Sequence, residues 1–428
     1  MKFVHPKIIL DPLWGIIDIT DFLPVIDTPQ FQKLGFKYQL GVADLVYPAA
    51  THTRKQHSFG AYHRTKILTN RWVEMGFIGR EDAKLANCFG LLHDIGHGPF
   101  SHVIESVTKE RWGRDHDDNG ARMLDGMKES VRASGIDHDG LKKMFGHSNP
   151  LYLAVHDKNL GSEKLDYLSR DAFYTIGEVP GVDYLAFHTY FIDGKVMIDA
   201  RGMDQAKAIQ EFYVKMFKNV YLRKNSLIGQ RFIQKITDEL LRTSNVSEDQ
   251  FWSLTDYGLL GLFENSASSL VKKYYRLFLE RQIPKTAVAL RPDKFKEVEK
   301  GRPKQMAVFG LDEELMQKIV TSPSFTELDK LRAAETAIAR IADVPEDAIL
   351  IVPPINSHRF VPQDIQIYNP NGQHSWLSQH FENHFKALAE EGKSYVVLRI
   401  CVLPEYREKL SQPKVAESVK EYVAGLAG

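Results

Sequence analysis

The stretch Leu91–His102, LLHDIGHGPFSH, is the most informative part of the sequence. The adjacent pair His93-Asp94 ends an apolar helical run, and His97 and His102 follow within nine residues, separated by glycines and a proline. An apolar core does not need so many imidazoles beside a carboxylate, because buried polar groups without partners are costly. A metal ion supplies the missing interactions and the charge balance. The stretch therefore predicts the centre of a metal-dependent hydrolase site.

The ligands of one ion must converge from several elements, since one helix offers few side chains to a single point. His93 and Asp94 lie about 100° apart around a helix and can take neighbouring coordination positions. We expect His57, on the preceding helix, as the third ligand and Glu163, at the start of a later helix, as the fourth. Arg54 lies three residues before His57 on the same helix face, so it predicts a guanidinium for a substrate phosphate in the same pocket.

The amphipathic helix predicted over Glu163–Thr175 carries a polar stripe. Lys164, Tyr167 and Asp171 recur on it at offsets of three and four, offering an amine and a phenol to phosphate oxygens and a carboxylate to a sugar hydroxyl. Mixed histidine and carboxylate ligation suits Mn, Fe, Ni, Co or Zn better than Ca, and such an ion lowers the pKa of bound water to about 7. Further proton-transfer groups near the ion would be His97, His102, Glu105 and His116.

Other polar residues are interpreted as structural. Asp166 and Arg170, at i and i+4 on the same helix, are expected to form a surface ion pair. Histidines elsewhere, His52 and His156 among them, are expected to be ordinary hydrogen-bonded residues. Cys88 lies in the apolar run before His93 and is expected to be a reduced core thiol.

The composition is that of an ordinary globular protein, and 428 residues are enough for two or three domains. The 55 basic and 55 acidic side chains give a formal net charge of zero, so no global basic field points to nucleic acid, which stays open as a partner but is not indicated. The sequence has no signal-peptide pattern and no run of about 20 apolar residues. We therefore expect a cytoplasmic protein with no membrane partner.

The periodicity predicts a mainly α fold with small β-hairpins. A helical bundle is expected over residues 1–285 and a C-terminal α+β lobe over 286–428, because the composition changes near Pro284. Hairpins are predicted at 7–19 and 191–199, the second with Asp193-Gly194 as its two-residue turn. Helices are predicted at 55–75, 81–93 and, as one long element, 203–242, and β-rich runs at 348–354, 364–368 and 394–403.

The order of His57, then His93-Asp94, then a distant acid resembles the H…HD…D pattern of the HD-domain metal-dependent phosphohydrolases. The similarity is closest to their deoxynucleoside triphosphate triphosphohydrolase branch and covers most of residues 7–176, with a weaker block, MFKNVYLRK, at Met216–Lys224. The similar blocks are DPLWG, IDTPQFQKL, QLG, YPAATHTRKQHSFGAYH, LLHDIGHGPFSH, DHDDNGARML and EKLDYLSRDAFYTIG. The resemblance implies that the helical bundle is an HD domain.

The resemblance also implies a role for each matching residue. The metal ligands would be His57, His93, Asp94 and Glu163. The catalytic group, which protonates the leaving oxygen or orients water, would be His102, His116 and Glu105. The substrate-binding residues would be Arg54, Lys164 and Tyr167 on the phosphates, Gln39 and Leu40 against the sugar, Asp171 on its 3′ hydroxyl, and His97 and Tyr221 in the pocket.

Some positions depart from the family pattern. Glu163 and Glu105 each stand where the family usually has an aspartate. Tyr213 and Phe217 stand where the triphosphohydrolases place an arginine and a histidine over the nucleotide.

The leading hypothesis is a nucleotide phosphohydrolase with a divalent metal cofactor (Mn, Fe, Mg, Ni, Co or Zn) that releases deoxynucleoside and triphosphate from a deoxynucleoside triphosphate. The resemblance implies assembly into a homo-oligomer, a dimer or higher. Tyr213 and Phe217 motivate one alternative, a phosphatase or phosphodiesterase acting on another nucleotide. Glu163 motivates another, a non-catalytic nucleotide-binding protein with a degenerate site.

Overall fold

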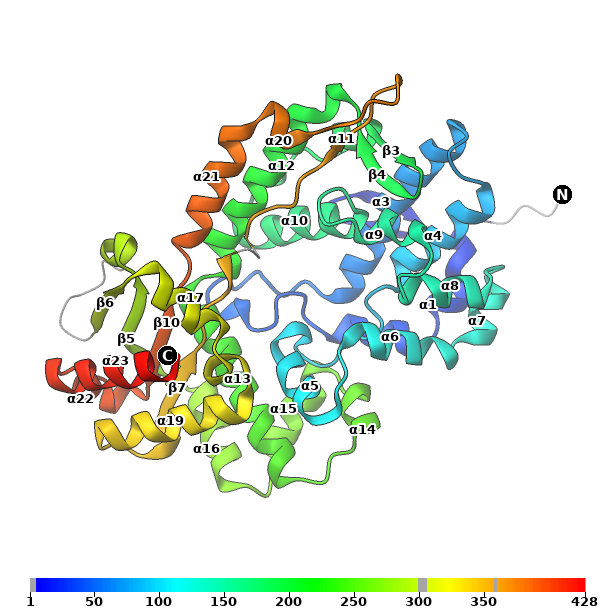
Figure 1. Cartoon of the computed structure of the whole chain (residues 1–428). Coiled ribbons are helices and arrows are strands. Elements are labelled where there is room, and N and C mark those ends of the chain that lie inside the picture. Colours follow the sequence, from blue (N-terminus) through cyan, green and yellow to red (C-terminus); the bar gives the residue numbers. More distant parts are fainter. Residues whose placement is uncertain (1–4, 299–305, 358–359, 428) are drawn as a thin grey trace.

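The computed structural model describes residues 5–298, 306–357 and 360–427. Helices dominate these residues, and the strands form small sheets (Figure 1). This arrangement confirms the predicted mainly α fold class with a β-containing lobe. Within the described residues, no helix combines the length and the apolar character that crossing a membrane requires.

The chain begins with the predicted hairpin. Strands β1 (Ile8–Asp11) and β2 (Gly15–Asp18) pair antiparallel, and the Asp11 carboxylate closes their turn by accepting the N–H groups of Leu13 and Trp14. Helices α1 (Leu23–Ile26) and α2 (Pro29–Gln32) follow. Thr28 caps α2 and proline occupies its first position, where a missing N–H costs nothing.

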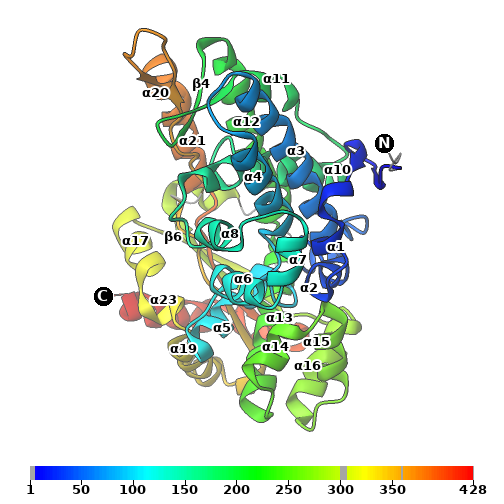
Figure 2. The same cartoon turned by 90° about the vertical axis from the view of Figure 1, so that its right-hand side faces the viewer.

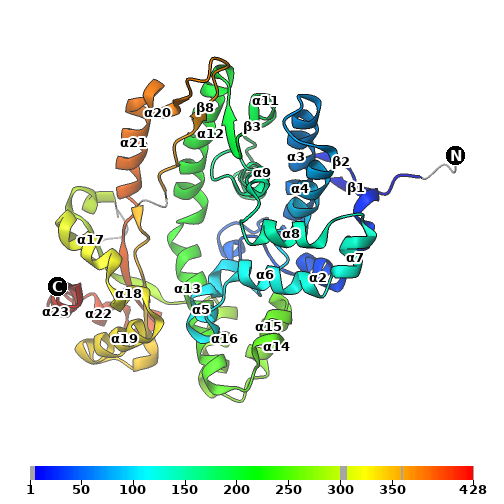
Figure 3. The same ribbon diagram turned by 45° about the vertical axis from the view of Figure 1, so that its right-hand side comes forward.

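Three central helices position the candidate site: α3 (Arg54–Glu74), α4 (Arg80–Leu92) and α10 (Ser162–Thr175). Helix α3 packs against both of the others, and Figure 3 shows it beside α4. Thr53 and Gln56 form a capping box at the start of α3, which fixes where this helix begins and hence where Arg54 and His57 point.

Shorter helices cover this core. Helix α8 packs on α4 and contacts α6, on the face shown in Figure 2. The shorter helices are α5 (Glu105–Trp112), α6 (His116–Asp125), α7 (Lys128–Ala133), α8 (His138–Phe145), α9 (Leu153–His156) and α11 (Asp183–Phe187).

The hairpin of β3 (Thr189–Ile192) and β4 (Lys195–Ile198) is confirmed, and Asp193 and Gly194 both have the positive φ that its two-residue turn requires. The single helix predicted over 203–242 is wrong. The chain forms α12 (Met203–Met216), a π-helical segment (Phe217–Tyr221) and α13 (Lys224–Thr243). The π-helical segment is a single wide turn, and the spacing of apolar residues in the helices before and after it stays close to 3.6. The hydrophobic periodicity therefore does not reveal the interruption.

Helices α14 (Glu248–Ser253), α15 (Asp256–Glu264) and α16 (Ser269–Leu279) follow. Beyond them a four-stranded sheet has the order β6-β5-β10-β7, with β5 and β6 parallel and the other neighbours antiparallel. Its strands are β5 (Lys285–Pro292), β6 (Ala307–Leu311), β7 (Ile349–Val352) and β10 (Leu398–Val402). The helices of this lobe are α17 (Glu313–Thr321), α18 (Pro323–Thr326), α19 (Leu328–Ala342), α22 (Arg407–Leu410) and α23 (Pro413–Ala427).

Part of the C-terminal region returns to the helical body. Strands β8 (Gln366–Ile367) and β9 (Ser375–Trp376) extend the β3–β4 hairpin into a sheet of order β3-β4-β8-β9. Helices α20 (Leu377–His380) and α21 (Glu382–Lys393) come next, and α21 runs beside α12 (Figure 1). The predicted β run at 364–368 is therefore confirmed, although it belongs to the hairpin sheet rather than to the lobe.

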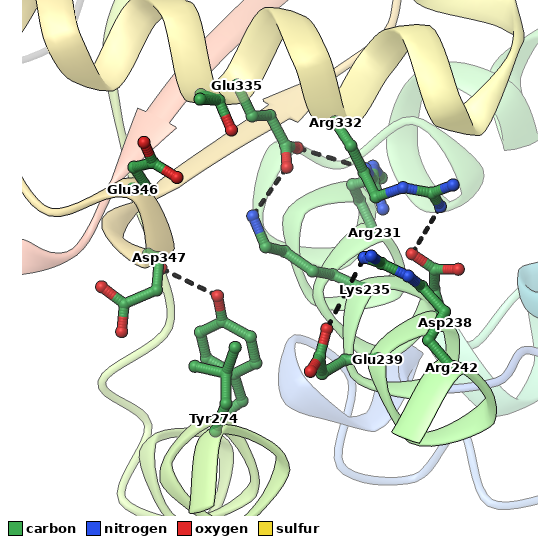
Figure 4. Close-up of a pocket in the computed structure, with 12 residues that line it drawn as sticks. Arg231, Lys235, Asp238, Glu239, Arg242, Tyr274, Arg332, Glu335, Glu346 and Asp347 are labelled. Atoms are coloured by element: carbon green, nitrogen blue, oxygen red, sulfur yellow. Dashed lines mark hydrogen bonds and ion pairs between the residues drawn. The ribbon is translucent and has the colours of Figure 1, made fainter. Parts of the chain in front are cut away.

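The helical body and the lobe share one buried cluster, which includes Phe232 of α13, Val288 of β5 and Ile351 of β7. A cavity of about 230 Å³ lies at the surface where α13, α16 and α19 meet (Figure 4). Glu335 accepts Arg231 at 3.1 Å and Lys235 at 2.6 Å. The other basic side chains of this cavity, Arg332 and Arg242, face Asp238 and Glu239. The side chains that line the cavity thus form a network of ion pairs between the helical body and the lobe. The domain division at residue 285 stays a prediction.

Candidate metal centre and active site

His57, His93 and Asp94 come together as a group, named here the metal cluster. His57 lies in the first turns of α3, His93 caps the C-terminus of α4, and Asp94 follows it. Their ligating atoms lie within 4.8 Å of one another, and no residue of the three is more than 4% exposed. The predicted convergence of these three side chains, from helices distant in sequence, is what the structure shows.

The tautomers of the two imidazoles follow from their partners. The His93 Nδ1 lies 2.9 Å from the carbonyl oxygen of Gly90, which can only accept, so this nitrogen carries the proton. The His57 Nδ1 lies 2.7 Å from the Asp166 carboxylate and carries the proton for the same reason. In the neutral rings both Nε2 atoms are therefore bare, and they face each other at 3.2 Å beside the Asp94 carboxylate. Three facing lone-pair donors repel one another unless a cation lies among them, so the donor set fits a divalent metal.

Glu163 lies beside the metal cluster but is not part of it. Its carboxylate pairs with the Nδ1 of His156 at 2.7 Å, and the His156 ring packs against the His93 ring at 5.6 Å. Burial raises the pKa of the Glu163 carboxyl, but the three histidines His156, His93 and His57 together lower it by more. The net shift is downward and favours the ionised form. Its role as a fourth ligand stays a prediction.

Asp166 and Arg170 are deeply buried, so the predicted surface pair is wrong. Neither side chain has any exposed surface, and Arg170 donates from Nε and Nη2 to the two Asp166 oxygens at 3.0 Å each. Arg170 also donates to Asp11 at 2.9 Å, and the Trp14 indole N–H donates to Asp166. Asp166 is thus a fixed carboxylate that orients His57 from behind, as carboxylates commonly do for metal-bound histidines.

Gly60 explains how Asp166 and Arg170 fit against α3. A β-carbon at position 60 would overlap the Asp166 carboxylate and the Arg170 guanidinium. The absence of a side chain on this part of α3 lets α10 approach closely enough for Asp166 to reach His57. An aspartate and an arginine four residues apart have the same spacing on an exposed face and on a buried one, so only this packing distinguishes the two.

Arg54 connects the metal cluster to the glycine-rich turn. Its Nη1 donates to Asp94 at 2.9 Å and its Nε donates to the Ser101 hydroxyl at 2.8 Å. The guanidinium is 3% exposed and lies within the site, as predicted. It holds the Asp94 carboxylate, and its contact with a substrate phosphate stays a prediction.

The predicted proton-transfer residues also come together, and we name them the relay cluster: His97, His102, Glu105 and His116. The Glu105 carboxylate lies between two imidazoles, pairing with the Nδ1 of His102 at 2.9 Å and with the Nδ1 of His116. His97 links the two clusters, because its Nε2 lies 3.2 Å from Asp94.

Electrostatics in the relay cluster favours proton transfer over metal binding. Burial lowers the pKa of His116, but Glu105 raises it by more, so the net shift is upward; the two histidines in turn lower the pKa of the Glu105 carboxyl against the effect of its burial. The rings of His97 and His116 stack at 4.1 Å, only 8° from parallel. A metal ion lies in the plane of each imidazole that binds it, and two parallel stacked rings do not share such a point.

The polar stripe of α10 reaches the site. Asp171 is 2% exposed and lies between the Nε2 of His52 and the hydroxyl of Tyr221, each at 2.8 Å. Lys164 donates to the carbonyl of Lys158 at 2.6 Å, and its Nζ lies 3.7 Å from the centre of the Tyr213 ring. Burial lowers the pKa of Lys164 to about 7, although Asp157 and Glu163 raise it.

The remaining predicted substrate contacts lie near these residues. The Tyr167 ring packs near the His57 ring at 6.4 Å. The segment with Gln39 and Leu40 runs along the start of α3, where the Gln39 N–H donates to the His52 carbonyl at 3.0 Å. The Gln39 side-chain oxygen is buried and has no hydrogen-bond partner among the described residues. The substrate roles of these residues stay predictions.

Sequence reasoning missed three residues that the structure brings to the site: His52, His156 and Asp166. His52 stands two residues before Arg54 in the motif, which was a signal that could have marked it. His156 carried no comparable signal, since its partner Glu163 is on another helix.

Comparison with known proteins gives the class. The HD domain family model matches residues 54–158. The chain is 29% identical over 295 residues to the deoxynucleoside triphosphate triphosphohydrolase SAMHD1 homolog of Dictyostelium discoideum, covering 62% of this chain and 56% of the relative. It is 27% identical over 289 residues to the deoxynucleoside triphosphate triphosphohydrolase SAMHD1 of Homo sapiens, covering 56% of this chain and 45% of the relative. The matches thus span less than two thirds of these relatives.

Solved structures show the same fold over nearly the whole chain. A phosphohydrolase from Bacteroides thetaiotaomicron superposes with a TM-score of 0.70 at 21% identity, covering 93% of this chain and 99% of that one. A hypothetical protein from Aquifex aeolicus gives 0.72 at 21% identity, with 95% and 99% covered. The chain thus shares the fold of these structures, and its residues 54–158 match the HD domain family. Within that class it resembles the deoxynucleoside triphosphate triphosphohydrolases.

Proposed function

We propose that this protein is a metal-dependent phosphohydrolase that cleaves a deoxynucleoside triphosphate into deoxynucleoside and triphosphate. The observation that carries the proposal is the pair of bare Nε2 atoms of His57 and His93 facing each other beside Asp94. The HD-domain match and the similarity to triphosphohydrolases support the reaction class and the substrate.

The metal would be held by His57, His93 and Asp94, with Glu163 as the proposed fourth ligand. The Glu163 carboxylate would have to turn away from His156 to act as a donor, and it is already close enough to His93 and His57 for their charges to lower its pKa. When bound, Mn, Fe, Mg, Ni, Co or Zn supplies Lewis-acid polarisation of a phosphoryl oxygen and lowers the pKa of a coordinated water.

The protein's own groups would bind and orient the nucleotide. Arg54 and Lys164 would neutralise phosphate charge at the edge of the metal cluster, which favours a transition state with more charge on the phosphoryl oxygens. Lys164 must leave the Lys158 carbonyl and the Tyr213 ring to do so. The Asp171 carboxylate, fixed by His52 and Tyr221, would accept the sugar's 3′ hydroxyl.

The relay cluster would supply the leaving-group proton. A water oxygen bonds to the α-phosphorus, the bond from phosphorus to the 5′ oxygen breaks, and that oxygen takes a proton to become the 5′ hydroxyl. Glu105 raises the pKa of His116, which favours its protonated form, and His102 lies on the other side of the same carboxylate. The cluster can thus donate one proton and refill it from solvent through the more exposed His102.

The test is a panel of nucleotides assayed with each metal, with the products identified. Inorganic triphosphate and deoxynucleoside in equal amounts are expected from the wild-type protein, and His93→Ala is expected to lose bound metal and turnover together. Wild-type turnover in the His93→Ala protein would contradict the assignment.

A second candidate function is a phosphatase or phosphodiesterase on another nucleotide. The contact of Lys164 with Tyr213 favours it, because an aromatic ring stands where the family places an arginine. Release of inorganic phosphate, or of a nucleoside monophosphate from a cyclic nucleotide, without triphosphate would select this function.

The non-catalytic alternative is supported by the pairing of Glu163 with His156. If the protein binds nucleotides without turnover and Glu163→Asp gains activity, this alternative replaces the proposed hydrolase. Homo-oligomer formation is also proposed only; light scattering of the purified protein measures it directly.

A further inference from the structure

A buried carboxylate outside the HD-domain motifs braces the candidate active site. Asp256 is the first residue of α15, and its side chain points away from the helix into the protein, where it is 1% exposed. Its Oδ2 accepts the N–H of Tyr38 and its Oδ1 accepts the N–H of Phe100, both at 2.7 Å. Each of its oxygens thus binds a different segment of the site, more than 150 residues away in sequence.

The first segment precedes the predicted sugar contacts. Tyr38 comes directly before Gln39 and Leu40 and forms a β-bridge with Thr53, the cap of α3. The carbonyl of Lys37 accepts the N–H of Arg54 at 2.9 Å. Any displacement of Tyr38 therefore also shifts the start of the helix that carries Arg54 and His57.

The second segment is the turn that leads into the relay cluster. Phe100 and Ser101 have φ of 53° and 55°, a left-handed conformation that is unfavourable for a residue with a β-carbon. The turn keeps this conformation while Phe100 is bound to Asp256 and the Ser101 hydroxyl accepts Arg54. His102 comes next, so the placement of its ring depends on the turn.

The charges around Asp256 suit an ionised carboxylate in this position. Lys37 and Arg54 are the basic groups that stabilise its negative charge, and Lys37, 1% exposed, donates from its ammonium to the carbonyl of His97. Burial nevertheless raises the pKa of Asp256 to about 6, although the two amide N–H groups and the two cations lower it. The neighbouring hydroxyls of Tyr38 and Tyr257 bond to each other at 2.7 Å.

We propose that Asp256 is a positioning residue that fixes the Tyr38–Leu40 segment relative to the Phe100–His102 turn, and so aligns the sugar-binding side of the site with the proton-donating side. Its effect on turnover rests on the proposed hydrolase function, but its effect on the two segments does not. A carboxylate suits this role because both its oxygens accept, whereas most other side chains of this size offer one acceptor at most.

The test compares Asp256→Asn with Glu264→Gln. Asparagine has the shape of aspartate but presents an NH₂ group to one of the two N–H donors, so one bond must break. Glu264 ends the same helix at an exposed position and touches neither segment, which makes its amide variant the matched control.

Amide hydrogen exchange is the primary measurement. Asp256→Asn is expected to speed exchange roughly tenfold in peptides covering residues 37–41 and 98–104, because a hydrogen bond to a charged acceptor is lost. Exchange elsewhere and bound metal should stay near wild type, as exchange should throughout in Glu264→Gln. Unchanged exchange in both segments overturns the proposal, whether or not the protein hydrolyses nucleotides.

Kinetics separate positioning from general destabilisation. With metal content unchanged, Asp256→Asn is expected to lower kcat roughly tenfold and to raise KM, since both sides of the site lose alignment. Metal loss in proportion to activity would instead identify a structural role and overturn the proposal. If the wild-type protein itself hydrolyses no nucleotide, the proposed function fails while the exchange result still decides this inference.

Discussion

Two histidine groups lie side by side in this protein and differ in which ring nitrogens converge. In the metal cluster, each imidazole has its Nδ1 bound to a fixed acceptor, which leaves the Nε2 atoms of His57 and His93 bare and facing each other. In the relay cluster, two imidazoles direct their Nδ1 atoms at one shared carboxylate, Glu105. If the proposed roles hold, similar residues serve as a cation site or as a proton-transfer site according to which nitrogens converge.

The largest expected effect contrasts the two clusters with one kind of substitution. His57→Gln removes an Nε2 ligand and should abolish both bound metal and turnover. His102→Gln should leave bound metal at the wild-type level while turnover falls. Metal analysis by mass spectrometry beside a turnover assay measures both. Equal metal loss in the two variants would show that the clusters are not chemically distinct.

Glu105→Gln tests the relay cluster itself. The amide keeps the shape but no longer raises the pKa of His116, so the proton donor is lost at neutral pH. Turnover is expected to fall by about 10²–10⁴, the usual contribution of general acid–base catalysis. The pH–rate profile is the measurement. An unaltered profile would exclude Glu105 from proton transfer.

Asp166→Asn tests the acceptor that fixes the metal cluster. Loss of the carboxylate behind His57 should weaken metal affinity about 10–100-fold, as for other outer partners of metal-bound histidines. Competition with a chelator measures the affinity. Asp183→Asn is the control, since Asp183 pairs with buried Arg64 but lies on the surface. Wild-type affinity in Asp166→Asn would mean that His57 keeps its orientation without this partner.

Asp256 gives the smallest effect on the clusters and a clear dependence on pH. Its folded-state pKa of about 6 lies above the ordinary value, so its contribution to folding is complete below about pH 4 and is lost as the pH rises through 6. The free energy of unfolding of the wild type, relative to Asp256→Asn, should therefore fall by about 3 kcal/mol between pH 4 and 7. Urea unfolding at each pH measures this difference. A constant difference would contradict the raised pKa.

The sequence was enough to predict the ligand-bearing helices and most of the site, because capping residues and ordered motifs are local signals. Thr53 and Gln56 mark the start of α3, and Asp193-Gly194 marks the hairpin turn. The residues behind the site were not predictable in this way. Asp166 reaches His57 only because two helices pack closely, and Asp256 reaches Tyr38 and Phe100 across more than 150 residues.

The lobe shows the same limit. The runs that became β7 and β10 were apparent because both strands are fully buried and consist mainly of branched apolar residues, with Arg399 of β10 the one exception. Strand β5 was missed although it is almost wholly buried, since its stretch without charge is short and is flanked by Lys285 and Arg291. The Arg291 guanidinium reaches the carbonyl of Ser394, a partner that pattern alone does not reveal.

Gly60 inverts a familiar rule of protein engineering. Replacing a glycine inside a helix by alanine ordinarily stabilises the helix by about 1 kcal/mol. Here the added methyl group would displace Asp166 from the His57 imidazole that it orients. The proposed metal would then be bound less tightly although no ligand had been changed. A search for stabilising substitutions in this protein would therefore find, in the first third of α3, a position where a gain in helicity displaces the partner of a candidate metal ligand.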